Sequence, residues 1–271
     1  MTLAEKLNQL KLDFMAQQLQ HVLSQTADRN LSPAAALEWL ADLEWEGRQS
    51  RSVQRRFRLS RLQTQLGIES FNFHHHKSRQ HMKARILRLL DLDFVRQGAN
   101  IILIGNPGTG KTFLAKIFGW KACQANLRVL FTPAMHMLNQ LLASQVDHSL
   151  LRKLKIYTDP TFLLIDELGY LSLDQQTSNL FYQVISTRHA EKRSTLITTN
   201  TIFSEWGNIL FNTTIAAAIA DRLVENSEVF LMGGPTWRTP KNGQRISPAA
   251  DSDLDQAPLC DDNPNRRSPA G

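Results

Sequence analysis

The chain has 271 residues, of which 42% are hydrophobic and 21% are charged, and its formal net charge is +6. This is enough apolar material for one sizeable core and a small second module. With only two cysteines, the chain is not expected to be a disulfide scaffold. It contains no apolar run long enough to span a membrane, and its first residues lack the apolar region of a secretion signal. We therefore expect a cytoplasmic protein with no membrane contact.

Charge is distributed unevenly along the chain. Residues 1–47 contain three basic and seven acidic side chains, whereas residues 48–97 contain twelve basic and three acidic ones. A concentrated basic block of this kind favours a polyanionic partner.

Residues 1–60 are expected to be helical. A capping box at Thr2–Glu5 begins the first helix, and Ser32 followed by Pro33 begins another. Gly47 is a candidate bend or break in this second helix. The helix carries six arginines without an intervening acid, and guanidinium groups suit phosphate oxygens. We expect them to contact DNA; the alternatives are a solvated helix surface, or pairing with the acids of residues 1–47. The six are Arg48, Arg51, Arg55, Arg56, Arg58 and Arg61.

Residues 67–238 are expected to form an α/β domain. Apolar strand candidates lie at 101–104, 129–131, 162–165, 196–199 and 229–231, with helical patterns at about 112–125, 134–143, 175–190 and 214–226. Five strands with helical crossovers predict a three-layer αβα domain with a parallel sheet. A helical domain at 1–66 should precede it, and the polar residues 239–271 are expected to be disordered.

A glycine-rich loop follows the first strand. Residues 105–112 spell G-x-x-x-x-G-K-[ST], between an apolar strand and a helical pattern, as this motif requires. Glycines allow backbone N–H groups to surround a polyphosphate, and the helix dipole favours the anion. Lys111 can reach the β- and γ-phosphates, and Thr112 can bind Mg²⁺. We expect the nucleotide to be held by Gly105, Asn106, Pro107, Gly108, Thr109, Gly110, Lys111, Thr112 and Phe113.

Two later strands also end in polar side chains. Asp166 and Glu167 follow the strand at 162–165, and neighbours in a strand alternate in direction, so they should have different roles. Asp166 suits the Mg²⁺ shell with Thr112, and Glu167 suits the general base that polarises the attacking water. This pair favours hydrolysis over transfer to a bound metabolite. Asn200 could orient that water.

The combination GNPGTGKT, LLIDE, ITTN and ADRL resembles the AAA+ superfamily. More closely, it resembles IstB-like helper ATPases of insertion sequences, relatives of the DnaC helicase loaders. The resemblance covers residues 1–238 and extends to Arg55–Phe57, Glu69–Phe73 and Asp166–Tyr170. It implies that Asn200 is the sensor-1 residue and that Arg222 is an arginine finger of a ring or spiral homo-oligomer. Arg188 is a second candidate for the finger, and a salt bridge with Asp221 is the structural alternative for Arg222.

The resemblance implies a protein that binds ATP and Mg²⁺, hydrolyses ATP, oligomerises on double-stranded DNA and assists a cognate transposase. A DnaC-like helicase loader and a nucleotide-gated DNA scaffold with little hydrolysis are the alternatives. A small-molecule kinase is disfavoured because the sequence has no evident substrate lid. Three adjacent histidines, His74–His76, are not expected to bind metal, since consecutive residues rarely point at one ion.

Overall fold

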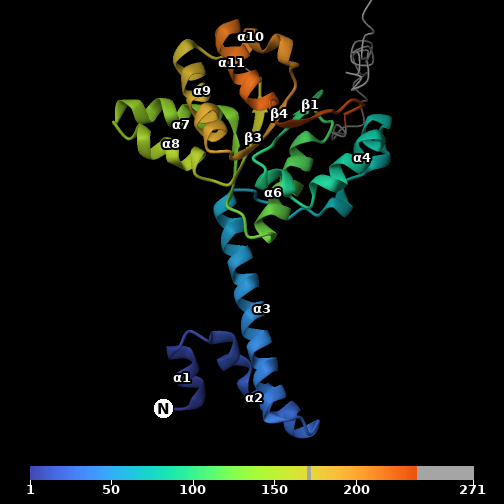
Figure 1. Ribbon diagram of the computed structural model, residues 1–271, viewed down its shortest axis with the longest axis vertical. Coiled ribbons are helices and arrows are strands. Elements are labelled where there is room, and N and C mark those ends of the chain that lie inside the picture. The colour runs from blue at the N-terminus through green and yellow to red at the C-terminus, as the bar shows by residue number, and fades with distance from the viewer. Residues whose placement is uncertain (170–171, 237–271) are drawn as a thin grey trace, which may run out of the picture.

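The computed structural model describes residues 1–169 and 172–236, with Ala27 described by its backbone alone. The sequence begins with three helices, α1 (Leu3–Gln9), α2 (Asp13–Asp28) and α3 (Pro33–Ser60). Figure 1 shows α3 as a long stalk, with α1 and α2 beside its lower part and the α/β domain at its upper end. Thr2 caps α1 in a capping box and Ser32 caps α3, as the sequence predicts.

Gly47 neither bends nor ends α3, which is a single helix of 28 residues. A β-carbon at this position would lie 2.3 Å from the Cγ atom of Phe14 in α2. The glycine therefore makes room for an aromatic ring where α2 crosses α3. The prediction of a break was wrong because a helix tolerates an isolated glycine where close packing requires one.

The sheet has five parallel strands in the order β2-β3-β4-β1-β5. All five predicted strands are present: β1 (Asn100–Ile104), β2 (Val129–Pro133), β3 (Phe162–Leu168), β4 (Ser194–Thr199) and β5 (Ser227–Leu231). The central strands β1 and β4 are buried along their whole length. Strand β1 therefore reads as an apolar run, whereas β4 buries hydroxyl side chains at both of its ends.

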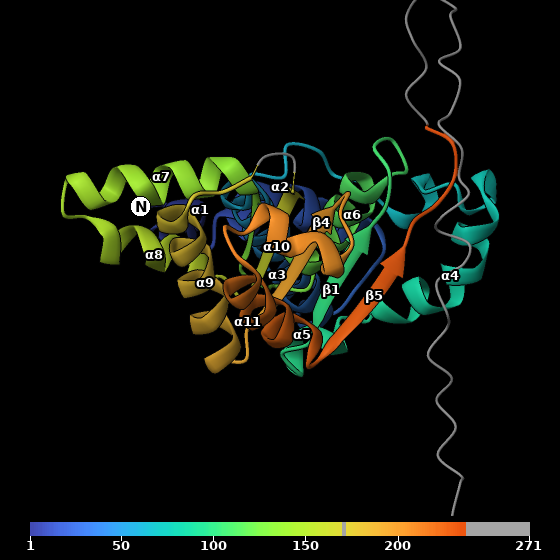
Figure 2. The same ribbon diagram turned by 90° about the horizontal axis from the view of Figure 1, so that it is seen from above.

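Helices cover both faces of the sheet (Figures 1 and 2). On β1, Ile101 and Leu103 join one core with α4 (Lys77–Leu89) and α6 (Lys111–Gln124). Ile102 and Ile104 join the other core with α7 (Ala134–Val146), α9 (Gln175–Ala190) and α11 (Thr213–Val224). The predicted three-layer α/β architecture is confirmed.

Shorter elements complete the domain: α5 (Asp93–Arg96), α8 (Leu150–Thr158), α10 (Trp206–Ile209), and the 3₁₀ turns at Ile68–Ser70, Phe73–His75 and Phe203–Glu205. In the part of the chain that the structure describes, no helix is long and apolar enough to cross a membrane. The predicted disorder of residues 239–271 concerns a segment that lies outside the described residues. Tyr170, at the end of the segment Asp166–Tyr170 that carries part of the resemblance, also lies outside them.

Candidate functional site

The glycine-rich loop joins β1 to α6. Gly110 adopts φ +90°, which L side chains rarely tolerate, and its neighbour Lys111 is the first residue of α6. Gly105 has a different requirement, since a β-carbon there would lie 2.2 Å from the carbonyl oxygen of Met232. The two glycines therefore allow a tight loop that places the amino terminus of α6, and the positive end of its dipole, at the carboxyl ends of the strands.

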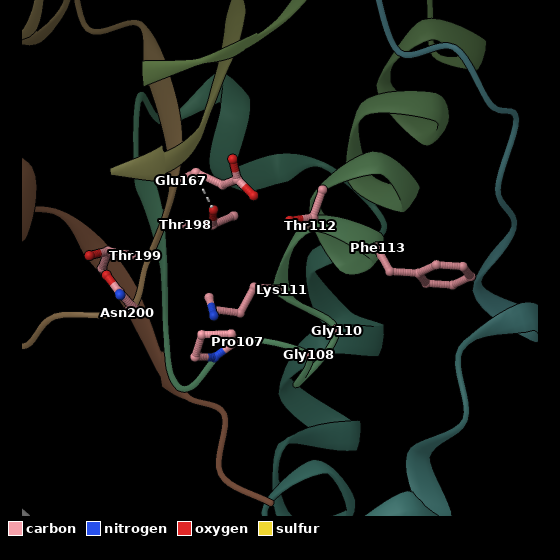
Figure 3. A pocket seen from close by; sticks show the side chains of 10 residues that line it. All are labelled: Pro107, Gly108, Gly110, Lys111, Thr112, Phe113, Glu167, Thr198, Thr199 and Asn200. Atoms are coloured by element: carbon pink, nitrogen blue, oxygen red, sulfur yellow. Dashed lines mark hydrogen bonds between the residues drawn. The ribbon is translucent and has the colours of Figure 1, made fainter. Parts of the chain in front are cut away.

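A pocket lies against this loop (Figure 3). Lys111 belongs to it, and its Nζ donates to the carbonyl oxygens of Gly105 and Asn106 at 2.6 and 2.9 Å. These bonds hold the ammonium group over the loop. Ten residues line the pocket: Pro107, Gly108, Gly110, Lys111, Thr112, Phe113, Glu167, Thr198, Thr199 and Asn200.

Three of the predicted nucleotide-binding residues do not line the pocket. The carbonyls of Gly105 and Asn106 accept from Lys111, and buried Thr109 donates its hydroxyl to the Asn106 carbonyl at 2.8 Å. These residues support the loop from behind. Phe113 is on the pocket rim, where it points away from Lys111 and its ring lies 6.3 Å from that of Phe71.

A chain of hydrogen bonds connects the loop to β3 and β4. The Thr112 hydroxyl donates to Asp166 Oδ1 at 2.9 Å, and the Thr198 hydroxyl donates to the same oxygen at 2.5 Å. Thr198 Oγ1 in turn accepts the Glu167 backbone N–H at 2.9 Å. A hydroxyl beside a buried carboxylate is an oxygen donor set that fits Mg²⁺. Thr112 and Asp166 are thus the residues present that could hold this ion.

Glu167 lies at an irregularity in β3. It adopts φ +61°, and the pairing of β3 with β4 shifts register between Ile165 and Leu168. A left-handed conformation is costly for a residue other than glycine and concentrates at functional sites. Here it leaves Asp166 buried while Glu167 is exposed at the pocket, with its carboxylate directed across it toward Thr112 (Figure 3).

The remaining sequence candidates fall in three different settings. Asn200 lines the pocket at the end of β4, and its Oδ1 accepts from the Thr201 hydroxyl at 3.1 Å. Arg222 on α11 does not line the pocket; its guanidinium lies over the Tyr182 ring at 4.9 Å and donates to the Ala218 carbonyl. Its predicted salt-bridge alternative with Asp221 is not among the ion pairs of the described residues.

Arg188 is a structural residue. Its side chain is 1% exposed, and it donates to the Thr195 hydroxyl and to four backbone carbonyls around the start of β3 and β4. Burial lowers the pKa of its guanidinium to about 9. A side chain fixed in this way cannot reach another subunit, so Arg188 does not fit the role of an arginine finger.

The fold agrees with comparisons to known proteins. The family model of the IstB-like ATP binding protein matches residues 5–244. The chain belongs to this family.

Two insertion-sequence proteins illustrate how far the similarity of this IstB-like chain extends. It is 34% identical to a protein of IS5376 from Geobacillus stearothermophilus, named for ATP binding, over 86% of this chain and 92% of that protein. It is 32% identical to the corresponding IS21 protein of Pseudomonas aeruginosa, over 86% of each. In structure, it resembles the DnaC helicase loader with a TM-score of 0.52 at 19% identity, over 66% of this chain and 99% of that one. This last likeness shows that the IstB-like chain has an AAA+ type of fold.

The structure of the IstB-like chain adds two residues that sequence reasoning missed. Thr198 appeared only as part of a strand, yet its hydroxyl connects Asp166 to Glu167. Arg79 appeared only as one of many basic residues, yet it is 4% exposed and donates to the carbonyls of Thr109 and Asn72 at 2.6 and 3.0 Å. Burial lowers the pKa of the Arg79 guanidinium. No local sequence pattern indicates these hydrogen bonds of Thr198 and Arg79, because each joins segments that are distant in the sequence.

The six arginines of α3 do not act as one group. Arg48 pairs with Glu44 of the same helix at 2.7 Å, and Arg51 pairs with Asp13 of α2 at 2.9 Å. Both acids belong to residues 1–47, so these two arginines follow the predicted alternative. Arg55 and Arg58 are exposed on the helix. Arg56 and Arg61 lie at its carboxyl end, where α3 meets the α/β domain.

Proposed function

We propose that this IstB-like protein is an ATPase that oligomerises on double-stranded DNA and assists the transposase of its insertion sequence. The observation that supports hydrolysis most directly is the bond network around Asp166. It connects Thr112 of α6, Asp166 and Glu167 of β3, and Thr198 of β4, and all of these except Asp166 line the pocket.

Each pocket residue has a chemical task in this proposal. The loop N–H groups and Lys111 bind the triphosphate, and Lys111 exchanges its carbonyl partners for phosphate oxygens. Thr112 and Asp166 would hold Mg²⁺, which when bound neutralises charge on the triphosphate. Glu167 accepts a proton from the water that attacks the γ-phosphorus, and Asn200 orients this water. The bond from phosphorus to the bridging oxygen breaks, and ADP and phosphate are released.

Arg222 is proposed to complete the site of a neighbouring copy. It does not line the pocket of its own chain, so a contact with nucleotide would have to be made in another subunit. There its charge would stabilise the negative charge that develops on the γ-phosphate during transfer. The stack on Tyr182 would present the guanidinium in a fixed orientation.

DNA and a transposase are proposed as partners on two grounds. The basic block at 48–97 favours a polyanion, and the relatives are named as products of insertion sequences. The proposed place of action is the site where the DNA of the insertion sequence is joined to its target. ATP hydrolysis would then control how long the oligomer remains on that DNA.

Glu167→Gln tests the hydrolytic part of the proposal. The amide cannot accept a proton, so we expect ATP turnover to fall by about 100-fold or more while ATP binding stays within about threefold. Steady-state phosphate release, measured with and without duplex DNA, would give this comparison, and wild type should turn over faster with DNA.

The matched control is Glu38→Gln, which removes an exposed carboxylate from α3 and should leave turnover unchanged. Negligible turnover by the wild-type protein, with DNA and without it, would contradict the proposed ATPase function.

A further inference from the structure

A groove with five basic side chains lies where the stalk helix meets the α/β domain. It is formed by the carboxyl end of α3, the start of β2 and helix α8, and we call it the basic groove. Apolar side chains, including those of Leu59 and Ile156, also line it. Figure 1 shows the upper end of α3 meeting the domain on this side, and α3 contacts β2. The basic side chains are those of Arg56, Arg61, Arg128, Arg152 and Lys155.

The groove is separate from the ATP pocket. The groove lies at the start of β2, with Arg128 just before Val129, whereas the ATP pocket lies at the carboxyl ends of β1, β3 and β4. In a parallel sheet these are opposite edges. An anion held in the basic groove is therefore not the triphosphate of ATP.

The basic side chains of the groove have few acidic neighbours among the residues that line it. Asp159 is the one acidic residue among its lining residues, and its carboxylate lies 3.7 Å from Arg193. Arg128 donates to the Asp159 backbone carbonyl at 2.7 Å, and Arg56 donates to the Ser52 hydroxyl at 2.8 Å. These neutral acceptors orient the guanidinium groups without cancelling their charge.

The backbone conformation at the end of α3 brings Arg61 into the basic groove. Arg61 follows the last residue of α3 and adopts φ +63°, so the chain leaves the helical path there. Arg128 precedes β2, and Arg152 and Lys155 lie three residues apart on α8, which places them on one side of this helix. Three segments distant in the sequence thus supply one cluster.

We propose that the basic groove binds the phosphate backbone of nucleic acid; this rests on the proposed function, of which it would be the DNA-contacting surface. Four of its five cations are arginines, whose planar forks bind phosphate oxygens in pairs. Exposed side chains on several elements suit a continuous backbone better than a single small anion.

The double substitution Arg152→Ala with Lys155→Ala tests this proposal. Both residues are exposed on α8, so the variant should fold. Loss of two phosphate contacts should weaken binding to a labelled mixed-sequence duplex by about tenfold or more at low salt. It should also reduce the slope of log affinity against log salt by about 2. Affinity is measured by anisotropy over a range of NaCl concentrations.

The matched control is Arg29→Ala with Lys121→Ala, which removes one arginine and one lysine from exposed positions just after α2 and on α6, outside the basic block at 48–97. Its net charge equals that of the groove variant, so a general electrostatic effect would change both equally. We expect the control to keep the wild-type slope. Both variants should keep wild-type ATP turnover measured without DNA, because none of these residues lines the ATP pocket.

Equal slopes for the groove variant and the control would overturn the groove assignment while leaving the proposed ATPase intact. The acidic residues 1–47 of a second copy are the competing occupant of the groove. Loss of self-association in the groove variant, with an unchanged DNA slope, would support that occupant and also overturn the proposal. Absence of duplex binding by the wild-type protein would instead contradict the proposed function itself.

Discussion

The Thr198 hydroxyl connects two carboxylate-bearing residues of β3. It donates to Asp166 Oδ1 and accepts the Glu167 N–H, and Glu167 is the residue with the left-handed backbone. A single hydroxyl on β4 therefore stabilises the irregularity that presents Glu167 to the pocket. We expect it to act as a positioning residue.

Thr198→Val would remove this hydroxyl while keeping the shape of the side chain. Asp166 and the Glu167 N–H lose their shared partner, and we expect the resulting displacement of Glu167 to raise the activation free energy by about 1.5–3 kcal/mol, or about a 10- to 150-fold loss of turnover. We expect ATP affinity to change little, because the loop and Lys111 are untouched. Turnover and nucleotide affinity should be measured on the same preparations.

Thr198→Ser provides the control, since it keeps the hydroxyl and should retain most of the turnover. A serine variant as impaired as the valine variant would show that packing, rather than the hydrogen bonds, matters at this position.

For single residues, the sequence indicates candidates that belong to a motif within one segment, but it does not indicate contacts between distant segments. Lys111, Thr112, Asp166 and Glu167 were found because their types and spacing follow from chemistry within one segment. Their predicted roles stay predictions, although in the structure three of them line one pocket and the fourth, Asp166, is bonded to Thr112 beside it. Arg188 could not be distinguished from Arg222 by sequence, because burial decides between them and burial depends on the whole domain.

Helix α2 begins against a side chain of another helix. Glu44 on α3 accepts the backbone N–H groups of Phe14 and Met15 at 2.8 and 3.0 Å, and it also accepts from Arg48. Burial would raise the Glu44 pKa, but these bonds together hold the pKa below its ordinary value. Glu44 thus caps α2 across the helix pair, as an anion at the positive end of the α2 dipole.

Because the pKa of Glu44 is lowered in the folded protein, Glu44 should stabilise the fold more at neutral pH than in acid. The stabilisation from Glu44 should be complete above its unfolded-state pKa of 4.5 and lost as the pH falls through the folded-state value. Glu44→Gln should therefore destabilise packing of α1 and α2 on α3 by about 1–3 kcal/mol near neutral pH. The effect should shrink in acid. Thermal unfolding followed by circular dichroism at several pH values would measure it.

Glu46→Gln removes an exposed carboxylate two residues away and should have little effect at any pH. A Glu44→Gln variant whose deficit stayed the same in acid would contradict a role for the charge.

Among whole elements, the sequence predicts the strands best. All five predicted strands are present, because each has an apolar segment that packs between the two helical layers, although β4 also buries hydroxyl side chains such as Thr198. Helix α8 was missed because it is only nine residues long, which is too short for a clear helical pattern in the sequence. The uninterrupted α3 was missed because the space for Phe14 at Gly47 is a tertiary feature.

At the scale of the whole molecule, the pocket and the candidate arginine finger, Arg222, lie apart within one chain. Lys111, Glu167 and Asn200 line the pocket, whereas Arg222 lies on Tyr182 away from it. In the proposed oligomer, each ATP site takes its loop from one copy and Arg222 from the next. This arrangement would couple hydrolysis to assembly on DNA.

Mixing two inactive variants tests this central claim most directly. Glu167→Gln keeps Arg222, and Arg222→Ala keeps Glu167, so each should have little turnover alone. In an equal mixture, about a quarter of the sites should pair an intact Glu167 with an intact Arg222 of the neighbour, if copies join head to tail at random. The account predicts that DNA-stimulated ATP turnover returns in the mixture to about this fraction of wild type. Turnover that stays at the sum of the two separate variants would contradict it.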